Sequence, residues 1–152
     1  MIPNAIILDT NLLLLLIVGT ADRAYIGKHR RLQGYSDADF TILVTLISSS
    51  PKIVVTPNTL TETSNLLRYI AEPARTHLCE FFRIMITAAG ESYIESSRAA
   101  GREEFPRLGL ADAVLLELAD RSHTLLTADL DLYLAALARG FSAENFNHYR
   151  AM

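Results

Sequence analysis

The stretch AIILDTNLLLLLIV, residues 5–18, places two apolar runs on either side of three polar residues. Residues 5–8 are a short β-rich run, which predicts a buried strand. Thr10 or Asn11 can cap a helix that follows the strand and ends near Gly19. The second run is far shorter than the ~20 residues of a membrane helix, so we expect a strand, a polar corner and a buried helix, with no membrane segment.

The rest of the chain repeats this alternation. Further extended segments are expected at residues 53–56, 93–96, 124–127 and 143–146. Helices are expected from the Ser36 and Asp39 capping box up to Pro51, and over residues 56–71, 74–89, 97–104, 110–122 and 129–139. Residues 20–36 are polar and basic, and we expect them to form a loop or a short helix.

Strands that alternate with helices predict an α/β fold: a three-layer α/β/α sandwich with a mainly parallel central sheet. The chain has 152 residues, the length of one domain, so we expect a single domain over residues 1–152. Right-handed crossovers place the strand ends and the starts of the following helices along one edge of such a sheet, where open sheets bind ligands. The functional site is expected at that edge.

Four acidic residues occur where apolar runs stop. Asp9 and Asp129 follow predicted strands, and Glu62 and Asp112 lie in the first turns of predicted helices. Capping explains one such residue, with a benefit of roughly 0.3–1 kcal/mol. It does not explain four in one crevice, because two like charges 4 Å apart repel by about 4 kcal/mol at an effective dielectric of 20. A divalent cation removes this repulsion, so the pattern predicts a metal site.

Oxygen ligands favour Mg²⁺ or Mn²⁺, since zinc prefers His or Cys. The four histidines, at positions 29, 77, 123 and 148, show no paired metal-binding spacing and are expected at a surface or interface. Cys79 is the only cysteine, so no intrachain disulfide can form; we expect a buried thiol in a helix and a cytoplasmic protein. One or two carboxylate-held ions suit the hydrolysis of a phosphodiester.

The net charge of −3 argues against a protein that binds nucleic acid with its whole surface. A local basic rim could still contact a phosphate backbone next to an acidic pocket. The candidate rim residues form two groups: Lys28, His29, Arg30 and Arg31, and Arg98, Arg102 and Arg107. The sequence leaves open which of them bind a substrate.

Four motifs resemble, in order and spacing, those of PIN domains. They are LDTN with Asp9 and Asn11, TPNTLTETSNLL with Glu62, LGLADAVLLELA with Asp112, and LLTADLDL with Thr127, Asp129 and Asp131. The resemblance covers nearly the whole chain, and it depends on the series of four motifs because no single motif is specific.

The resemblance implies a PIN-like α/β/α sandwich with Mg²⁺- or Mn²⁺-dependent ribonuclease activity. It assigns Asp9, Glu62, Asp112 and Asp129 as the catalytic, metal-binding acids and Asp131 as an auxiliary acid at the metal. It also implies that Asn11 and Thr127 support the metal cluster by hydrogen bonds. Many small standalone PIN proteins are VapC-type toxins, usually dimers neutralised by a cognate antitoxin. Residues 20–40 are longer and more basic than in the shortest of them.

Two other function classes are compatible with parts of the pattern. A non-catalytic PIN-like module could bind RNA or protein, although such a module has no need of four mutually repelling acids. A phosphatase of the haloacid dehalogenase type could use Asp9, but the acid two residues further on is replaced by Asn11, which cannot shuttle a proton. The sequence has no Gly-rich phosphate loop after a strand and no Gly-x-Ser-x-Gly elbow.

Overall fold

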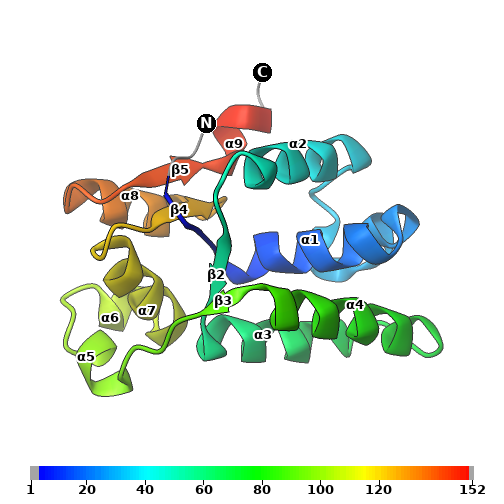
Figure 1. Ribbon diagram of the computed structural model, residues 1–152, viewed down its shortest axis with the longest axis horizontal. Helices are drawn as coiled ribbons and strands as arrows, with labels where there is room; N and C mark the ends of the chain where they lie inside the picture. Colours follow the sequence, from blue (N-terminus) through cyan, green and yellow to red (C-terminus); the bar gives the residue numbers. More distant parts are fainter. Residues whose placement is uncertain (1–3, 151–152) are drawn as a thin grey trace.

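β1, Ile6–Leu8, is the central strand of a five-stranded sheet in which every strand pairing is parallel. In the computed structural model, which describes residues 4–150, the strand order is β3-β2-β1-β4-β5 (Figure 1). The other strands are β2 Ile53–Val55, β3 Gly90–Glu91, β4 Thr124–Thr127 and β5 Ala143–Asn145. The chain adds β2 and β3 on one side of β1 and then β4 and β5 on the other. The boundary between β1 and β4 is therefore a topological switch point.

Helices connect the strands and cover both faces of the sheet. They are α1 Thr10–Ala21, α2 Asp37–Ser48, α3 Pro57–Leu67, α4 Ala74–Ala88, α5 Ser96–Ala100, α6 Phe105–Leu108, α7 Leu110–Ala119, α8 Leu130–Ala138 and α9 Phe146–Arg150. Two short 3₁₀ helices, η1 Arg23–Lys28 and η2 Arg30–Leu32, lie between α1 and α2.

Alternate residues of β1 point to opposite layers, as the pleat of a strand requires. Ile6 and Leu8 pack into a cluster with apolar residues of α1 to α4, whereas Ile7 packs with α7 and α8. Figure 1 shows α1 to α4 on one side of the sheet and α5 to α8 on the other. The predicted α/β fold class, a three-layer sandwich with a parallel sheet, is confirmed.

α1 is buried on nearly all sides, which explains its almost continuous apolar sequence. Leu12 to Leu15 are each at most 1% exposed, because α2, α3, α4 and η1 all contact the helix. The residue that caps α1 is Asp9, whose side chain accepts a hydrogen bond from the backbone nitrogen of Leu12. The expected cap at Thr10 or Asn11 is therefore wrong by one or two residues, and the helix continues past Gly19 to Ala21.

Several predicted boundaries are also wrong. α2 ends at Ser48, ahead of Pro51. α3 ends at Leu67 rather than 71, because tighter i to i+3 hydrogen bonds begin at Arg68. α7 ends at Ala119 rather than 122, since Ser122 has a positive φ of 69°. The residues that extend the sheet after α4 are Gly90 and Glu91, which pair with Val54 and Val55 of β2, and not residues 93–96. The polar segment 97–104 contains α5 and then a turn before α6.

Two single residues differ from their predicted surroundings. Cys79 is exposed, because α4 turns Leu78 and Phe82 toward the core and the next position faces solvent. His29, expected at a surface or interface, is only 1% exposed, because its ring hydrogen-bonds within the fold. Within residues 4–150, no helix combines the length and the apolar character needed to cross a membrane.

Candidate active site

Asp9 lies where β1 ends and α1 begins, and its carboxylate is held on both oxygens. Oδ1 accepts a hydrogen bond from the backbone nitrogen of Leu12 at 3.0 Å, and Oδ2 accepts from the Thr127 hydroxyl and from the backbone nitrogen of Ala128. Burial raises the pKa of this carboxyl, whereas the bond from Thr127 and the backbone bonds act to lower it. Asp9 is therefore a buried acid with a fixed orientation.

Thr127, the last residue of β4, connects Asp9 to Asp129. Its hydroxyl donates to Asp9 and accepts a hydrogen bond from the backbone nitrogen of Asp129 at 2.9 Å. Asp129 caps α8 by accepting from the backbone nitrogen of Leu132 at 3.2 Å. Because β1 and β4 are neighbours, their two carboxyl ends bring both aspartates to the switch point. The hydrogen bond expected of Thr127 is present.

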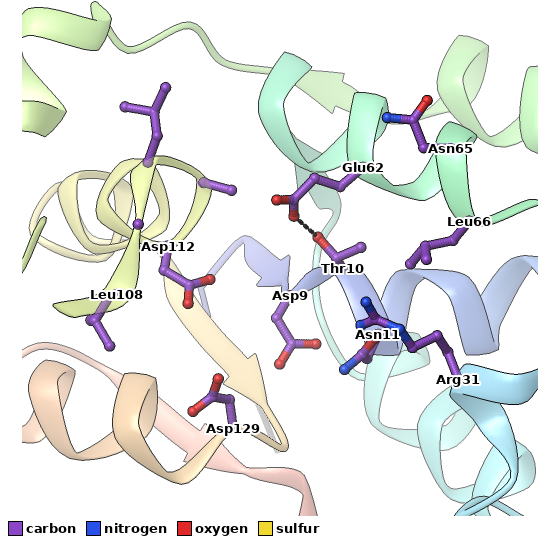
Figure 2. A pocket seen from close by; sticks show the side chains of 13 residues that line it. Asp9, Thr10, Asn11, Arg31, Glu62, Asn65, Leu66, Leu108, Asp112 and Asp129 are labelled. Atoms are coloured by element: carbon purple, nitrogen blue, oxygen red, sulfur yellow. Dashed lines mark hydrogen bonds between the residues drawn. The ribbon is translucent and has the colours of Figure 1, made fainter. Parts of the chain in front are cut away.

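Glu62 reaches the same place from α3. Thr56 caps this helix, with Pro57 as its first residue, as the sequence predicts. The Thr10 hydroxyl, at the start of α1, donates to Oε1 of Glu62 at 2.6 Å. The glutamate is solvent-exposed, so this bond from a neighbouring helix is what orients it toward Asp9 (Figure 2).

Asp112 lies in the first turn of α7. Gly109, with φ of 87°, makes the turn that leads into this helix, a conformation that glycine adopts without strain. Burial, followed by the negative charges of Asp9, Asp129 and Glu62, together raise the pKa of the Asp112 carboxyl to about 7. The four predicted acids therefore act on one another electrostatically, as the sequence predicts for a shared crevice.

All four acids line one pocket of about 420 Å³, which Figure 2 shows at close range. They come from four different places in the fold: the ends of β1 and β4, the second turn of α3 and the first turn of α7. The donors are carboxylate oxygens, which suit Mg²⁺ or Mn²⁺. The raised pKa of the Asp112 carboxyl, caused by burial and by the neighbouring acids, is a second observation that fits a missing positive charge. The donor set thus fits a divalent cation.

The acids surround the pocket without meeting at one point. In the part of the chain that the structure describes, no three His, Cys, Asp or Glu side chains are gathered tightly enough to hold a metal ion as they stand. Separate carboxylates are the arrangement expected where like charges repel. A bound ion would therefore have to draw Asp112, Asp129 and Glu62 toward the more rigid Asp9.

The auxiliary residues divide into two groups. Asn11 lines the pocket, although no hydrogen bond joins its side chain to the acids within residues 4–150. Asp131 is exposed in the first turn of α8 and is not among the residues that line the pocket. The role of an auxiliary acid at the metal is therefore not supported by its position.

The sequence does not predict the roles of two pocket residues, Thr10 and Arg31. Thr10 was considered only as a helix cap, and its bond to Glu62 spans 52 positions, which no local pattern reveals. Arg31 was one of seven candidate rim residues, and it is the one that lines the acidic pocket. The sequence indicates Arg31 only as part of the basic run from Lys28 to Arg31, and it does not show which residue of that run lies in the pocket.

The second candidate group of basic residues lies elsewhere and serves the fold. Arg102, with only 12% of its side chain exposed, pairs with Glu117 at 2.9 Å and with Glu104 at 3.4 Å. Arg98 pairs with Glu117 at 3.2 Å. Arg107 lines a separate hollow beside α6 and α8. None of these three arginines lines the acidic pocket.

Compared with known proteins, the chain matches no family model and no curated sequence. The similarity to PIN domains therefore stays a prediction from the four motifs. What supports a function is the geometry of the pocket itself.

Proposed function

We propose that this protein is a metal-dependent endoribonuclease that hydrolyses RNA phosphodiester bonds. The observation that carries the proposal is the convergence of four carboxylates from four elements on one open pocket at the carboxyl edge of a parallel sheet. Burial and, after it, repulsion from the other three acids raise the pKa of Asp112 to about 7. An arrangement that costs stability in this way is typical of a site that binds a cation. RNA is chosen as the substrate because the four motifs resemble those of PIN domains.

Asp9, Glu62, Asp112 and Asp129 would hold Mg²⁺ or Mn²⁺. Such an ion supplies a Lewis acid that lowers the pKa of a coordinated water and stabilises charge on a phosphoryl oxygen. Asp9 is suited to be the fixed ligand, because hydrogen bonds from Thr127, Leu12 and Ala128 hold its oxygens. Glu62 and Asp129, which are less buried, can adjust to the ion and to the substrate.

In the proposed reaction the oxygen of a water molecule attacks phosphorus, and the bond from phosphorus to the leaving sugar oxygen breaks. The water proton passes to solvent or to a pocket carboxylate, and the leaving oxygen takes up a proton. The chain contributes the orientation of the acids: Thr127 fixes Asp9, and Thr10 fixes Glu62. Positioning and charge stabilisation are the main sources of catalysis in phosphoryl chemistry.

The decisive experiment compares the parent protein with Asp112→Asn in an RNA-cleavage assay. Asp112 is the best position, because within the described residues its side chain forms no hydrogen bond whose loss would damage the fold. Single-stranded RNA should be cut with Mg²⁺ or Mn²⁺ and left intact with EDTA. Asp112→Asn should lower the cleavage rate by at least about 100-fold.

Asp131→Asn is the matched control, since it makes the same chemical change at an exposed carboxylate outside the pocket. It should cleave like the parent. If Asp112→Asn also cleaves like the parent, the four acids are not catalytic. If the parent binds RNA but never cleaves it, and calorimetry detects no Mn²⁺ binding, the non-catalytic binding module is the correct function.

A homodimer, a cognate antitoxin and a cytoplasmic location belong to the same proposal, because the resemblance to VapC-type toxins implies them. Size-exclusion chromatography with light scattering tests the dimer. The neighbouring gene tests the antitoxin: a small upstream reading frame with a DNA-binding N-terminus supports a toxin. A standalone RNA-processing nuclease would have no such neighbour.

A further inference from the structure

A basic and aromatic surface adjoins the acidic pocket. We call it the basic rim and define it as Lys28, Arg30, Arg31 and Tyr69. Arg31 lines the pocket together with Leu66 of α3 (Figure 2). Tyr69 follows Leu66 by three residues along the chain. The guanidinium carbon of Arg30 lies 5.0 Å from the centre of the Tyr69 ring. The rim therefore begins inside the pocket and continues to Tyr69, just past the end of α3 at Leu67.

His29 fixes this surface to the site. Its Nε2 atom lies 2.8 Å from the carbonyl oxygen of Leu66, and its Nδ1 atom accepts a hydrogen bond from the backbone nitrogen of Arg31 at 3.0 Å. Nδ1 is thus an acceptor, so Nε2 carries the proton and donates to Leu66. The ring also meets Tyr69 edge to face, with the ring centres 6.2 Å apart. The backbone of the basic segment is therefore held against the helix that carries Glu62.

The cations of the rim are available to a ligand. Lys28, Arg30 and Arg31 form no ion pair with any acid in residues 4–150, whereas the arginines at positions 23, 75, 83, 98, 102, 139 and 150 each have an acidic partner. Tyr69 is 60% exposed, which leaves part of its ring uncovered. Unpaired cations beside an exposed ring are the combination that binds single-stranded nucleic acid.

We propose that the basic rim binds single-stranded RNA on one side of the acidic pocket, with Arg31 at the phosphate nearest the pocket and Tyr69 stacked on an unpaired base. Lys28 and Arg30 contact phosphates further along the strand. The choice of RNA as the ligand rests on the proposed nuclease function. The rim supplies the positive charge that brings a polyanion to a pocket of four carboxylates, which would otherwise repel it.

Binding is measured by fluorescence anisotropy with a 5′-fluorescein-labelled 12-nucleotide RNA of mixed, unstructured sequence. The buffer contains EDTA and about 50 mM salt, so that RNA is bound but not cut. Arg31→Gln should weaken binding about 5- to 10-fold and lower the slope of log affinity against log salt by about 0.7, the loss of one phosphate contact to a single strand. Tyr69→Leu should weaken binding by about 5- to 100-fold, and Tyr69→Phe should bind like the parent.

Arg121→Gln is the matched control for Arg31→Gln. Arg121 is exposed and precedes β4, at the edge of the sheet opposite the pocket, and it has no acidic partner within the described residues. The Arg121→Gln substitution changes the net charge by the same amount as Arg31→Gln, and this variant should bind RNA with an affinity within about twofold of that of the parent. A 12-base-pair duplex of the same sequence should bind more weakly than the single strand, because its bases are not free to stack on Tyr69.

The outcomes separate this proposal from the proposed function. If Arg31→Gln and Tyr69→Leu bind RNA more weakly than the parent, and the parent never cleaves RNA, the RNA-binding role of the basic rim is supported and the nuclease function is contradicted. If the parent cleaves RNA and both variants bind and cleave RNA as the parent does, the RNA-binding role of the basic rim is contradicted and the nuclease function is supported. Equal losses for Arg31→Gln and Arg121→Gln also overturn the rim, since net charge alone would then explain the binding. In an active enzyme, Tyr69→Leu should raise KM with little change in kcat.

Discussion

The hydroxyl of Thr10 donates a hydrogen bond of 2.6 Å to Glu62 and so joins the first residue of α1 to α3 beside the pocket. Thr10 follows Asp9 directly, which places the Glu62 carboxylate next to the most rigid acid of the site. A residue that orients a metal ligand typically contributes 10- to 100-fold to metal affinity. Thr10 therefore influences the site without contributing an oxygen to the set of four acids.

Thr10→Val is expected to weaken Mn²⁺ binding by about 10-fold, because valine keeps the shape of the side chain and removes the donor to Glu62. Isothermal titration calorimetry measures the affinity. Thr10→Ser keeps the hydroxyl and is the control, which should bind Mn²⁺ nearly as tightly as the parent. If the valine and serine variants bind the ion equally, the hydrogen bond has no part in metal binding.

Asp112→Asn is expected to stabilise the metal-free protein by about 1–4 kcal/mol at pH 8, because it removes a buried charge that three other acids repel. The pKa of Asp112 in the fold is about 7 and lies above the unfolded value of 3.8, so ionisation opposes folding. The parent should therefore lose stability as pH rises from about 4 to 7 and level off above that, and this part of the loss should be missing in the variant.

Urea unfolding in EDTA at several pH values measures this effect. Asp131→Asn is the control, since Asp131 is exposed and outside the pocket, and it should change stability by less than about 0.5 kcal/mol. Saturating Mn²⁺ should stabilise the parent more than Asp112→Asn. A variant less stable than the parent in EDTA at pH 8 would contradict the repulsion inferred among the acids.

The layers of this fold follow from local patterns in the sequence. The uninterrupted apolar run after Asn11 predicts a buried helix, and α1 is buried on nearly all sides. Short apolar runs alternating with amphipathic ones predict a parallel sheet, and the five strands confirm it. The ends of the helices and strands were harder to predict, because they depend on the neighbouring elements that each one pairs with or packs against. β3 consists only of the two residues that pair with Val54 and Val55 of β2, and the positive φ of Ser122 prevents the helix from reaching residue 122.

The site was predictable where it depends on strand ends and helix starts. Asp9 and Asp129 lie just after the ends of β1 and β4, and Asp112 lies in the first turn of α7, so the strand and helix boundaries placed all three. Contacts between distant segments were not predictable. Thr10 and Glu62 are 52 positions apart, and His29 and Leu66 are 37 apart. The packing of the segment after α1 against α3 decides both the burial of His29 and the place of the basic rim.

Gly19→Ala is expected to destabilise the protein by about 1–3 kcal/mol, although alanine is normally favoured over glycine within a helix by about 1 kcal/mol. A Cβ atom at Gly19 would overlap the ring of Phe40, which belongs to α2 and is only 5% exposed. The ring has little room to move, so α1 and α2 would have to separate. Thermal unfolding measures the loss.

The double variant Gly19→Ala with Phe40→Leu tests the cause. The smaller leucine leaves space for the new methyl group, so the double variant should be more stable than the sum of the two single changes predicts. Additive losses would show that the close approach of Gly19 to the Phe40 ring does not limit the packing of these helices.

Arg150→Gln is expected to lower the free energy of unfolding by about 2 kcal/mol at pH 7, because it leaves the buried Asp39 carboxylate without its ionic partner. The Arg150 guanidinium donates a hydrogen bond to each carboxylate oxygen of Asp39, both at 3.1 Å, and so connects α9 to α2. Burial acts to raise the pKa of Asp39, but the bonds from Arg150 and Ser36 outweigh it and hold that pKa below its usual value of 3.8. The stabilisation is therefore present above pH 3.8 and is lost as pH falls through the lower pKa of the folded state, where the stabilities of parent and variant should converge.

Arg83→Gln is the control: it breaks an exposed ion pair with Glu80 and should lower the free energy of unfolding by less than about 0.5 kcal/mol in the same urea titrations. Equal losses for the two arginines would contradict a structural role for the α9 to α2 contact.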